Sequence, residues 1–122
     1  MRKYYAGIDH VQLAAPVGSE DVARRFFGET LGMTEIPKPR SLHKRGGLWF
    51  QCGAQQLHIG IQEDFRPATK AHPAFRMKHI DEFRAGLLAR GVALRDDDLI
   101  PGAKRFYLDD PFGNRIEFLE WT

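Results

Sequence analysis

The stretches Asp110-Pro111-Phe112-Gly113-Asn114 and Arg115-Ile116-Glu117-Phe118-Leu119-Glu120-Trp121 decide how the whole chain folds. The first predicts a turn, because Pro presets a turn angle and both Gly and Asn tolerate the left-handed backbone that closes it. The second predicts a strand with Ile116 and Phe118 on one face and Glu117 on the other. A carboxylate on a short, apolar strand is costly to bury unless a cation meets it. Three histidines earlier in the chain, His10, His58 and His72, could supply that cation by holding a metal.

Working outward from this strand, the pattern predicts an internal repeat of strand, helix and three strands. In the first copy we expect a strand over 7–15, a helix between Ser19 and Gly32, and strands over 33–36, 48–52 and 56–61. In the second copy we expect a strand over 72–78, a helix from Asp81 to Gly91, and strands over 92–95, 104–108 and 114–121. The acidic run 96–98 is expected to form a turn. The predicted units span about 6–62 and about 71–122 of a single domain covering 1–122.

The register of the repeat aligns the candidate ligands. Gly32 precedes His58 by as many residues as Gly91 precedes Glu117, and both glycines are expected to end their helices. His58 therefore corresponds to Glu117, and His10 corresponds to His72. All four are expected opposite the main apolar residues of their strands, so they would converge at a pseudo-twofold axis. This matched register favours the set as metal ligands over four unrelated polar residues.

Bulk properties limit the classes of function. The chain has 122 residues, 43% of them hydrophobic, which suits one compact domain with its own core. A formal net charge of +2 is too small to indicate nucleic-acid binding. No apolar run is long enough to cross a bilayer, and the first residues lack an apolar signal core. Together with a single cysteine, Cys52, this predicts a cytoplasmic protein that binds no membrane.

One basic cluster lies in a segment rich in Pro and Gly, so it is expected to be a loop. The cluster comprises Lys38, Arg40, His43, Lys44 and Arg45. A solvated surface loop is one interpretation, and a lid that attracts an anionic substrate is the other.

Imidazole and carboxylate ligands suit Zn, Ni, Co, Mn or Fe(II). Four such ligands would leave coordination sites open, where a substrate oxygen can bind and be polarised. His43 and His79 have no counterpart in the repeat and are expected at the surface.

The sequence resembles the vicinal oxygen chelate superfamily, which includes glyoxalase I, extradiol dioxygenases, fosfomycin-resistance enzymes and bleomycin-resistance proteins. The resemblance covers residues 7–121. It rests on Asp9-His10-Val11-Gln12-Leu13, Leu57-His58-Ile59-Gly60, His72-Pro73-Ala74-Phe75 and the segment 110–118 quoted above. It implies an α+β fold in which two βαβββ units form a cupped mixed sheet with the helices on its outer face. It also implies one divalent metal held by His10, His58, His72 and Glu117.

The expected function is that of a metal-dependent enzyme of the glyoxalase or dioxygenase type. Such an enzyme binds a small oxygenated substrate through two adjacent oxygens, for isomerase, lyase or dioxygenase chemistry. Glu117 is the expected proton acceptor. The weaker candidates for contact with the substrate are Gln12, Trp49, Arg76, Arg105 and Tyr107.

The alternative is a protein that sequesters a drug or metabolite, with Trp49, Phe50 and Phe65 lining its pocket. A homodimer is also expected, since family members commonly pair. Edge strands and Trp121 offer a surface for the contact.

Overall fold

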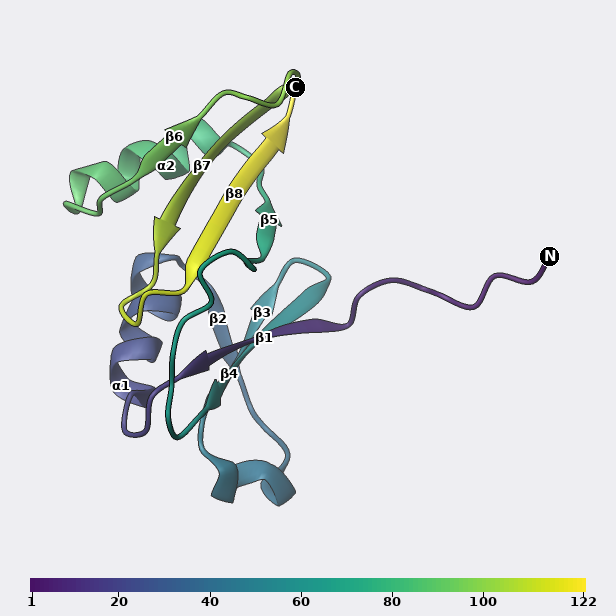
Figure 1. Cartoon of the computed structure of the whole chain (residues 1–122), viewed down its shortest axis with the longest axis vertical. Coiled ribbons are helices and arrows are strands. Elements are labelled where there is room, and N and C mark those ends of the chain that lie inside the picture. The colour runs from purple at the N-terminus through teal and green to yellow at the C-terminus, as the bar shows by residue number, and fades with distance from the viewer. The chain divides into compact units, whose positions relative to one another are not determined.

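A computed structural model describes residues 1–122, which divide into unit 1, Met1–Phe65, and unit 2, Arg66–Thr122 (Figure 1). Each unit has a four-stranded mixed sheet and one main helical segment. The order of elements is strand, helix, three strands in both units, so the predicted βαβββ repeat is confirmed. No helix is long and apolar enough to cross a membrane.

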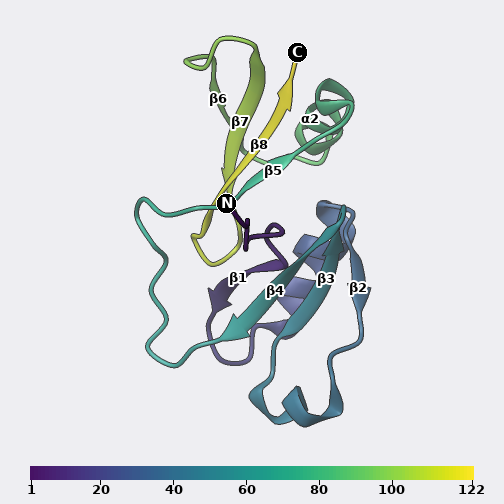
Figure 2. The same ribbon diagram turned by 90° about the vertical axis from the view of Figure 1, so that its right-hand side faces the viewer.

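The sheet of unit 1 has the strand order β1-β4-β3-β2 (Figure 2). Strand β1 pairs in parallel with β4, and β4, β3 and β2 form an antiparallel meander. A turn at Gly53-Ala54 joins β3 to β4. The strands are β1 His10–Ala15, β2 Thr34–Ile36, β3 Leu48–Cys52 and β4 Gln55–Ile61.

The helical segment of unit 1 begins as α1, Glu20–Ala23, and continues as a π-helix, Arg24–Thr30. Here the Leu31 amide donates to the Phe26 carbonyl, five residues back. The sequence predicted an ordinary helix, because the wider period cannot be recognised over seven residues. The segment ends before Gly32, whose φ of +76° favours glycine, close to the predicted end of the helix.

The loop between β2 and β3 contains a 3-10 helix, Arg40–Arg45, where the sequence had suggested irregular structure. Gly47 follows it with a φ of +87°. A Cβ atom at Gly47 would lie 2.1 Å from the Ile59 carbonyl oxygen on β4, so only glycine fits where β3 begins.

One face of the unit 1 sheet packs on the helical segment. The buried residues of this core are Ala15, Ala23, Phe27, Leu31, Leu48, Phe50, Leu57 and Ile59. The alternation of a strand places His10, Gln12, His58 and Trp49 on the opposite face. We call this opposite surface the polar face of unit 1.

The sheet of unit 2 has the equivalent order, β5-β8-β7-β6, with β5 parallel to β8 and the rest antiparallel. Its elements are β5 Ala74–Arg76, α2 Ile80–Ala89, β6 Arg95–Asp97, β7 Ala103–Asp109 and β8 Arg115–Trp121. His72 and Pro73 precede β5 rather than lying within it. The helix begins close to the predicted Asp81 and ends before Gly91, whose φ is +78°.

The strand that follows α2 was predicted with the wrong bounds. Strand β6 covers Arg95–Asp97, whereas the sequence predicted a strand over 92–95 followed by an acidic turn. Local propensity failed here because contacts distant in sequence stabilise the two aspartates in an extended backbone. Asp96 pairs with Arg84 of α2, and Asp97 pairs with Arg105 of β7.

The core of unit 2 is an aromatic cluster between α2 and one face of the sheet. Phe106 and Phe118 stack with centroids 5.2 Å apart, and Phe83 of α2 lies 5.2 Å from Phe118. Ile80, Leu87, Leu108 and Ile116 complete it. The opposite surface, which carries Glu117, Arg105 and Tyr107, is the polar face of unit 2.

The final hairpin turns where the sequence predicted. One Asp110 carboxylate oxygen accepts hydrogen bonds from the amides of Phe112 at 2.9 Å and Asn114 at 2.8 Å. The other accepts from the Asn114 side-chain amide at 2.8 Å. Burial raises the pKa of Asp110, against the effect of these hydrogen bonds. The turn fixes the register that sets Glu117 opposite Tyr107.

The sheet registers confirm the alignment of the repeat. Gln12 on β1 lies opposite His58, and Ala74 on β5 lies opposite Glu117. His10 precedes Gln12 by two residues, as His72 precedes Ala74. Trp49 and Tyr107 also occupy equivalent positions, because Trp49 on β3 faces His58 and Tyr107 on β7 faces Glu117.

Candidate metal and substrate site

The polar face of unit 1 carries three stacked rings that cross three strands. His58 lies between the other two, with ring centroids 4.0 Å from both Trp49 and His10. The interplanar angles are 5° to Trp49 and 17° to His10. We call these three residues the aromatic stack. His58 is 5% exposed, so the stack holds one imidazole almost completely out of water.

Each histidine of the stack has one ring nitrogen held by an oxygen acceptor. His10 Nδ1 lies 2.8 Å from the Asp9 carboxylate, and His58 Nε2 lies 2.9 Å from the Gln56 side-chain oxygen. A hydrogen on those nitrogens leaves His10 Nε2 and His58 Nδ1 as lone-pair donors. Outer partners of this kind orient metal-binding histidines in proteins. Burial and the nearby charge of His10 lower the pKa of His58, against the effect of Asp9, which favours the neutral ring that binds metals.

Gln12 lies beside the stack on the same face. A Cβ atom at position 60 would lie 2.4 Å from the Gln12 side-chain nitrogen, so Gly60 leaves the space that this side chain crosses. Gln12 itself is exposed. A flexible amide next to two imidazoles can hydrogen-bond to a polar ligand on this face.

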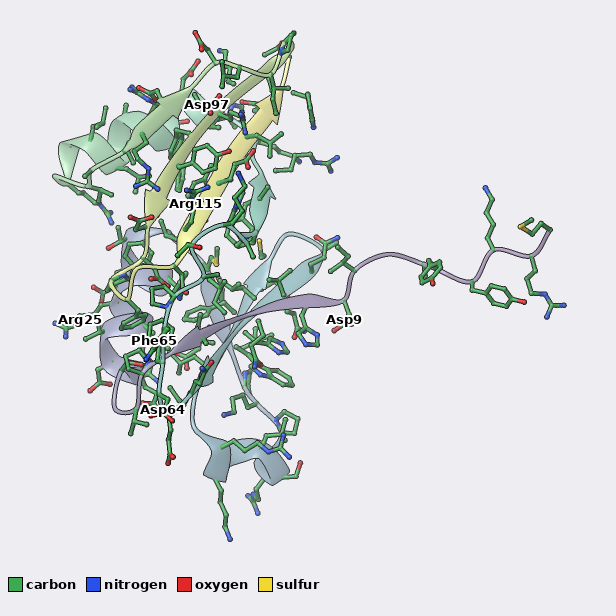
Figure 3. All side chains as sticks on the ribbon, viewed as in Figure 1. Asp9, Arg25, Asp64, Phe65, Asp97 and Arg115 are labelled. Atoms are coloured by element: carbon green, nitrogen blue, oxygen red, sulfur yellow. The ribbon has the colours of Figure 1, made fainter.

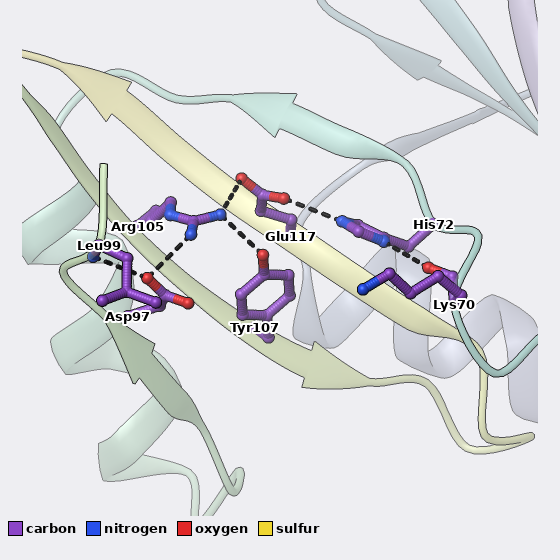
Figure 4. Close-up of polar contacts among 7 residues, drawn as sticks. All are labelled: Lys70, His72, Asp97, Leu99, Arg105, Tyr107 and Glu117. Carbon is purple, nitrogen blue, oxygen red and sulfur yellow. Dashed lines mark hydrogen bonds and ion pairs between the residues drawn. The ribbon is translucent and has the colours of Figure 1, made fainter. Parts of the chain in front are cut away.

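The polar face of unit 2 is organised around Glu117 (Figure 4). One Glu117 oxygen lies 2.9 Å from His72 Nε2, and the other accepts a hydrogen bond from Arg105 Nη1 at 3.1 Å. Arg105 also donates to the Tyr107 hydroxyl at 2.7 Å and to Asp97 at 2.8 Å. We call these five residues the glutamate network. Arg105 Nε is buried and has no hydrogen-bond partner.

Glu117 is held in its ionised form. Burial acts to raise the pKa of Glu117, but hydrogen bonds from His72 and Arg105 and the charge of Arg105 outweigh it and lower the pKa. Only 7% of Glu117 is exposed. The sequence had assigned the cation that meets this carboxylate to a metal held by the histidines, whereas in the structure Arg105 pairs with it directly.

His72 is oriented in the same way as the histidines of unit 1. Its Nδ1 lies 2.8 Å from the Lys70 carbonyl oxygen, which directs Nε2 toward Glu117. Both atoms facing the ring are acceptors, so a cation between Nε2 and the carboxylate satisfies the pair. A proton or a divalent metal can take that role.

The four candidate ligands thus come together as two pairs, one in each unit. His10 lies against His58 in unit 1, and His72 is hydrogen-bonded to Glu117 in unit 2. Neither unit by itself holds three or more His, Cys, Asp or Glu side chains placed to bind a metal. The chemistry of the donors fits a divalent transition metal, since His10 and His58 each keep one nitrogen for it and His72 Nε2 faces an ionised carboxylate.

The remaining predicted contact residues differ in their surroundings. Trp49 belongs to the aromatic stack, and Arg105 and Tyr107 belong to the glutamate network. Arg76 is on the polar side of β5 but is exposed and forms no hydrogen bond or ion pair. The prediction that Phe50 lines the pocket of a sequestering protein was wrong, because Phe50 is fully buried on the helix side of its strand.

Three contributors were missed by the sequence: Asp9, Gln56 and Asp97. Asp9 adjoins His10, and Gln56 lies two residues before His58 on the same face, so both could have been found as partners of the histidines. Asp97 could not, because its strand was misplaced. His43 and His79 are exposed, as expected.

Comparison with solved structures gives the relationship of the chain to known proteins. No protein-family model and no curated protein matches it. A crystal structure of a glyoxalase family protein from Bacillus anthracis is 58% identical over 100% of both chains, with a TM-score of 0.98. A lactoylglutathione lyase from Agrobacterium tumefaciens is 22% identical, with a TM-score of 0.77, over 97% of this chain and 96% of that one.

A third similar structure is TnmS3, an antibiotic binding protein from a Streptomyces species. It is 22% identical over 98% of this chain and 100% of that one, with a TM-score of 0.71. The two more distant structures share the fold. The identity and complete coverage of the first carry the family assignment: the chain belongs to the glyoxalase family of the vicinal oxygen chelate superfamily.

Proposed function

We propose that the protein is a metal-dependent enzyme that binds a small oxygenated substrate through two adjacent oxygens. The reaction would be of the isomerase, lyase or dioxygenase type. His10, His58, His72 and Glu117 would hold one divalent ion, the first two from unit 1 and the last two from unit 2. One chain or two copies could supply the two pairs. The donor set suits Zn, Ni, Co, Mn or Fe(II).

The observation that carries this proposal is the matched orientation of the donors at equivalent positions of the repeat. His10, His58 and His72 each give one ring nitrogen to a fixed oxygen acceptor. His10 and His58 keep the other nitrogen for a ligand, and the other nitrogen of His72 faces Glu117. Glu117 is buried and ionised. A structural role alone does not require three imidazoles to be oriented in this way.

A bound divalent ion would polarise substrate oxygens and favour negative charge on them. The residues of the chain supply the remaining functions. Glu117 accepts a proton from the substrate, and Arg105 and Tyr107 keep its carboxylate in position. Gln12 hydrogen-bonds to the substrate, and Trp49 provides a flat apolar surface beside it. The half-buried single cysteine, Cys52, is consistent with action in the cytoplasm.

The alternative function is sequestration of a drug or metabolite. The aromatic stack supports it, because a flat face of indole and imidazole suits an aromatic ligand, and one neighbour of the fold is an antibiotic binding protein. Sequestration would need neither a metal nor an ionised Glu117. Metal content therefore separates the two functions.

The test is elemental analysis of protein purified without a chelator. We expect near-stoichiometric transition metal in the wild type and its loss in a His10→Ala, Glu117→Ala double variant. His43→Ala is the matched control, since His43 is an exposed histidine bonded only to the Lys38 carbonyl. Metal retained in full by the double variant would remove these residues from the site. Tight binding of an aromatic drug by metal-free protein, without turnover, would favour sequestration.

A further inference from the structure

Arg115 on β8 is a cation that pairs with no carboxylate of its own unit. The β7–β8 register sets Asp109 directly opposite Arg115. Both Asp109 oxygens are instead bound by Arg95 of β6, at 2.9 and 3.2 Å. The Arg115 guanidinium lies over the ring of Tyr107, 5.6 Å from its centroid. Figure 3 labels Arg115 on β8. Its charge is therefore not neutralised within unit 2.

The position of Arg115 places this charge beside the proposed ligands. Arg115 precedes Glu117 by two residues on the same face, which is about 7 Å along a strand. His72 is at the register position of Arg115, because Ala74, two residues after His72, lies opposite Glu117. Tyr107 joins the two sides: its ring contacts the Arg115 guanidinium, and its hydroxyl belongs to the glutamate network.

Only unit 2 has a charged residue at this position of the repeat. The equivalent residue of unit 1 is Gln56, whose amide is occupied by His58. Arg115 is also half-buried, unlike the exposed Arg76 on the same face. A partly desolvated cation without a counter-ion costs free energy until an anion binds it. Its planar fork matches the two oxygens of an oxyanion.

We propose that Arg115 binds an oxyanion of the substrate, a carboxylate or a phosphonate. The substrate class is then a small acid that also carries two adjacent chelating oxygens. This inference rests on the proposed function, because the chelating end of the substrate is assigned to the metal. Arg115 sets specificity, and Glu117 carries the chemistry.

Three probes that share a catechol ring test the proposal: catechol, 3,4-dihydroxybenzoate and 3,4-dihydroxyphenylphosphonate. Calorimetry on the metal-loaded protein measures the dissociation constant of each. We expect at least one acid to bind about 10-fold more tightly than catechol, as a charge-assisted hydrogen bond provides. The acid with the larger gain identifies the oxyanion.

Substitutions separate Arg115 from the general charge of the protein. Arg115→Gln should abolish the preference for the acid and leave catechol binding unchanged, and Arg115→Lys should keep part of the preference. Arg84→Gln is the control, since Arg84 pairs with Asp96 on the helix side of the sheet. An Arg115→Gln protein of unchanged thermal midpoint that still prefers the acid would overturn the proposal.

Arg95 gives a second, independent test. Arg95→Gln frees Asp109 to pair with Arg115 across the strands, so the preference for the acid should weaken. Adding Asp109→Asn removes that competitor and should restore the preference. If the double variant prefers the acid over catechol no more than Arg95→Gln alone does, the free charge of Arg115 is not what binds the anion.

Failure of the proposed function would appear differently. In that case catechol binding would not depend on metal in any variant. Benzoate and benzamide then test Arg115 on metal-free protein. A preference for benzoate over benzamide that Arg115→Gln removes would support the anion site at Arg115. Equal affinity of the wild type for benzoate and benzamide would overturn the proposal.

Discussion

Glu117 meets an imidazole, a guanidinium and a phenol on a single sheet face. The hydrogen bonds that lower its pKa also fix the direction of both carboxylate oxygens. A base with a lowered pKa is weak in the free protein. A ligand that drew Arg105 or His72 away would raise the proton affinity of Glu117, which would couple binding to basicity at this residue.

At this scale we predict the effect of Glu117→Gln. The amide keeps an oxygen and the shape of the side chain but removes the basicity, so turnover should fall by about 10²–10⁴ if proton transfer is slow. Steady-state kinetics on hemithioacetals, catechols and 2-oxoacyl compounds, with several metals restored, would measure it. Affinity for unreactive substrate analogues should change far less.

Glu63→Gln is the matched control, because Glu63 is exposed and lies outside both polar faces. It should leave turnover unchanged. Equal losses in the two variants, or an unchanged rate in Glu117→Gln, would contradict the assignment of Glu117 as the base.

The candidate site was predictable from the sequence to the extent that it depends on register. His10, His58, His72 and Glu117 fall at matched positions, which counting from Gly32 and Gly91 detects. The pairing of Glu117 with Arg105 was less accessible, because it follows from the β7–β8 register. The stacking of Trp49 on His58 likewise requires knowing which residues face each other across strands.

At the scale of elements, the strands with clear alternation were predicted well and those with polar sequences were not. Strand β3 was predicted with its observed bounds, and β4 and β8 to within one residue. Strand β6 was misplaced because Arg95–Asp97 contains no apolar residue, and its ion pairs are formed with α2 and β7. Tertiary contacts outweighed local propensity there.

The close approach of β4 to Gly47 leads to a prediction about the sheet of unit 1. Gly47→Ala would bring a Cβ to 2.1 Å from a backbone oxygen that cannot move away, and the φ of +87° adds strain. We expect the free energy of unfolding to fall by at least about 3 kcal/mol, at the upper end for single substitutions. Urea denaturation followed by circular dichroism would measure the change.

Gly18→Ala provides the comparison, since Gly18 has a similar φ of +79° but no atom within 4 Å of its added Cβ. It should cost only the backbone term, about 1–2 kcal/mol. Similar losses in the two variants would show that strain rather than the contact with β4 governs Gly47.

At the scale of the whole molecule, each unit presents unpaired sheet edges and exposed apolar residues. Strands β1 and β5 are edges of their sheets, as are β2 and β6. Tyr4, Tyr5, Ile8 and Trp121 are among the exposed large side chains. In Figure 1 the residues before β1 run away from the body of unit 1 as an extended arm. Such surfaces are commonly covered by association.

We therefore predict a homodimer in solution. Light scattering coupled to size exclusion should give twice the mass of 14.0 kDa at micromolar concentration. Trp121→Glu should weaken association if the end of β8 takes part, whereas Leu99→Glu, also an exposed apolar residue, serves as a comparison. A monomer mass across the whole concentration range would contradict the prediction.

The aromatic stack also has an optical consequence. The chain contains two tryptophans, and the second, Trp121, is 57% exposed at the end of β8. The indole of Trp49 lies parallel to His58 with centroids 4.0 Å apart, close enough for an excited indole to lose energy to whatever the imidazole binds. In a Trp121→Phe protein the single remaining tryptophan, Trp49, stacks on a candidate ligand. With excitation selective for tryptophan, the fluorescence of such a protein should report occupancy of His58 without added dye, label or turnover.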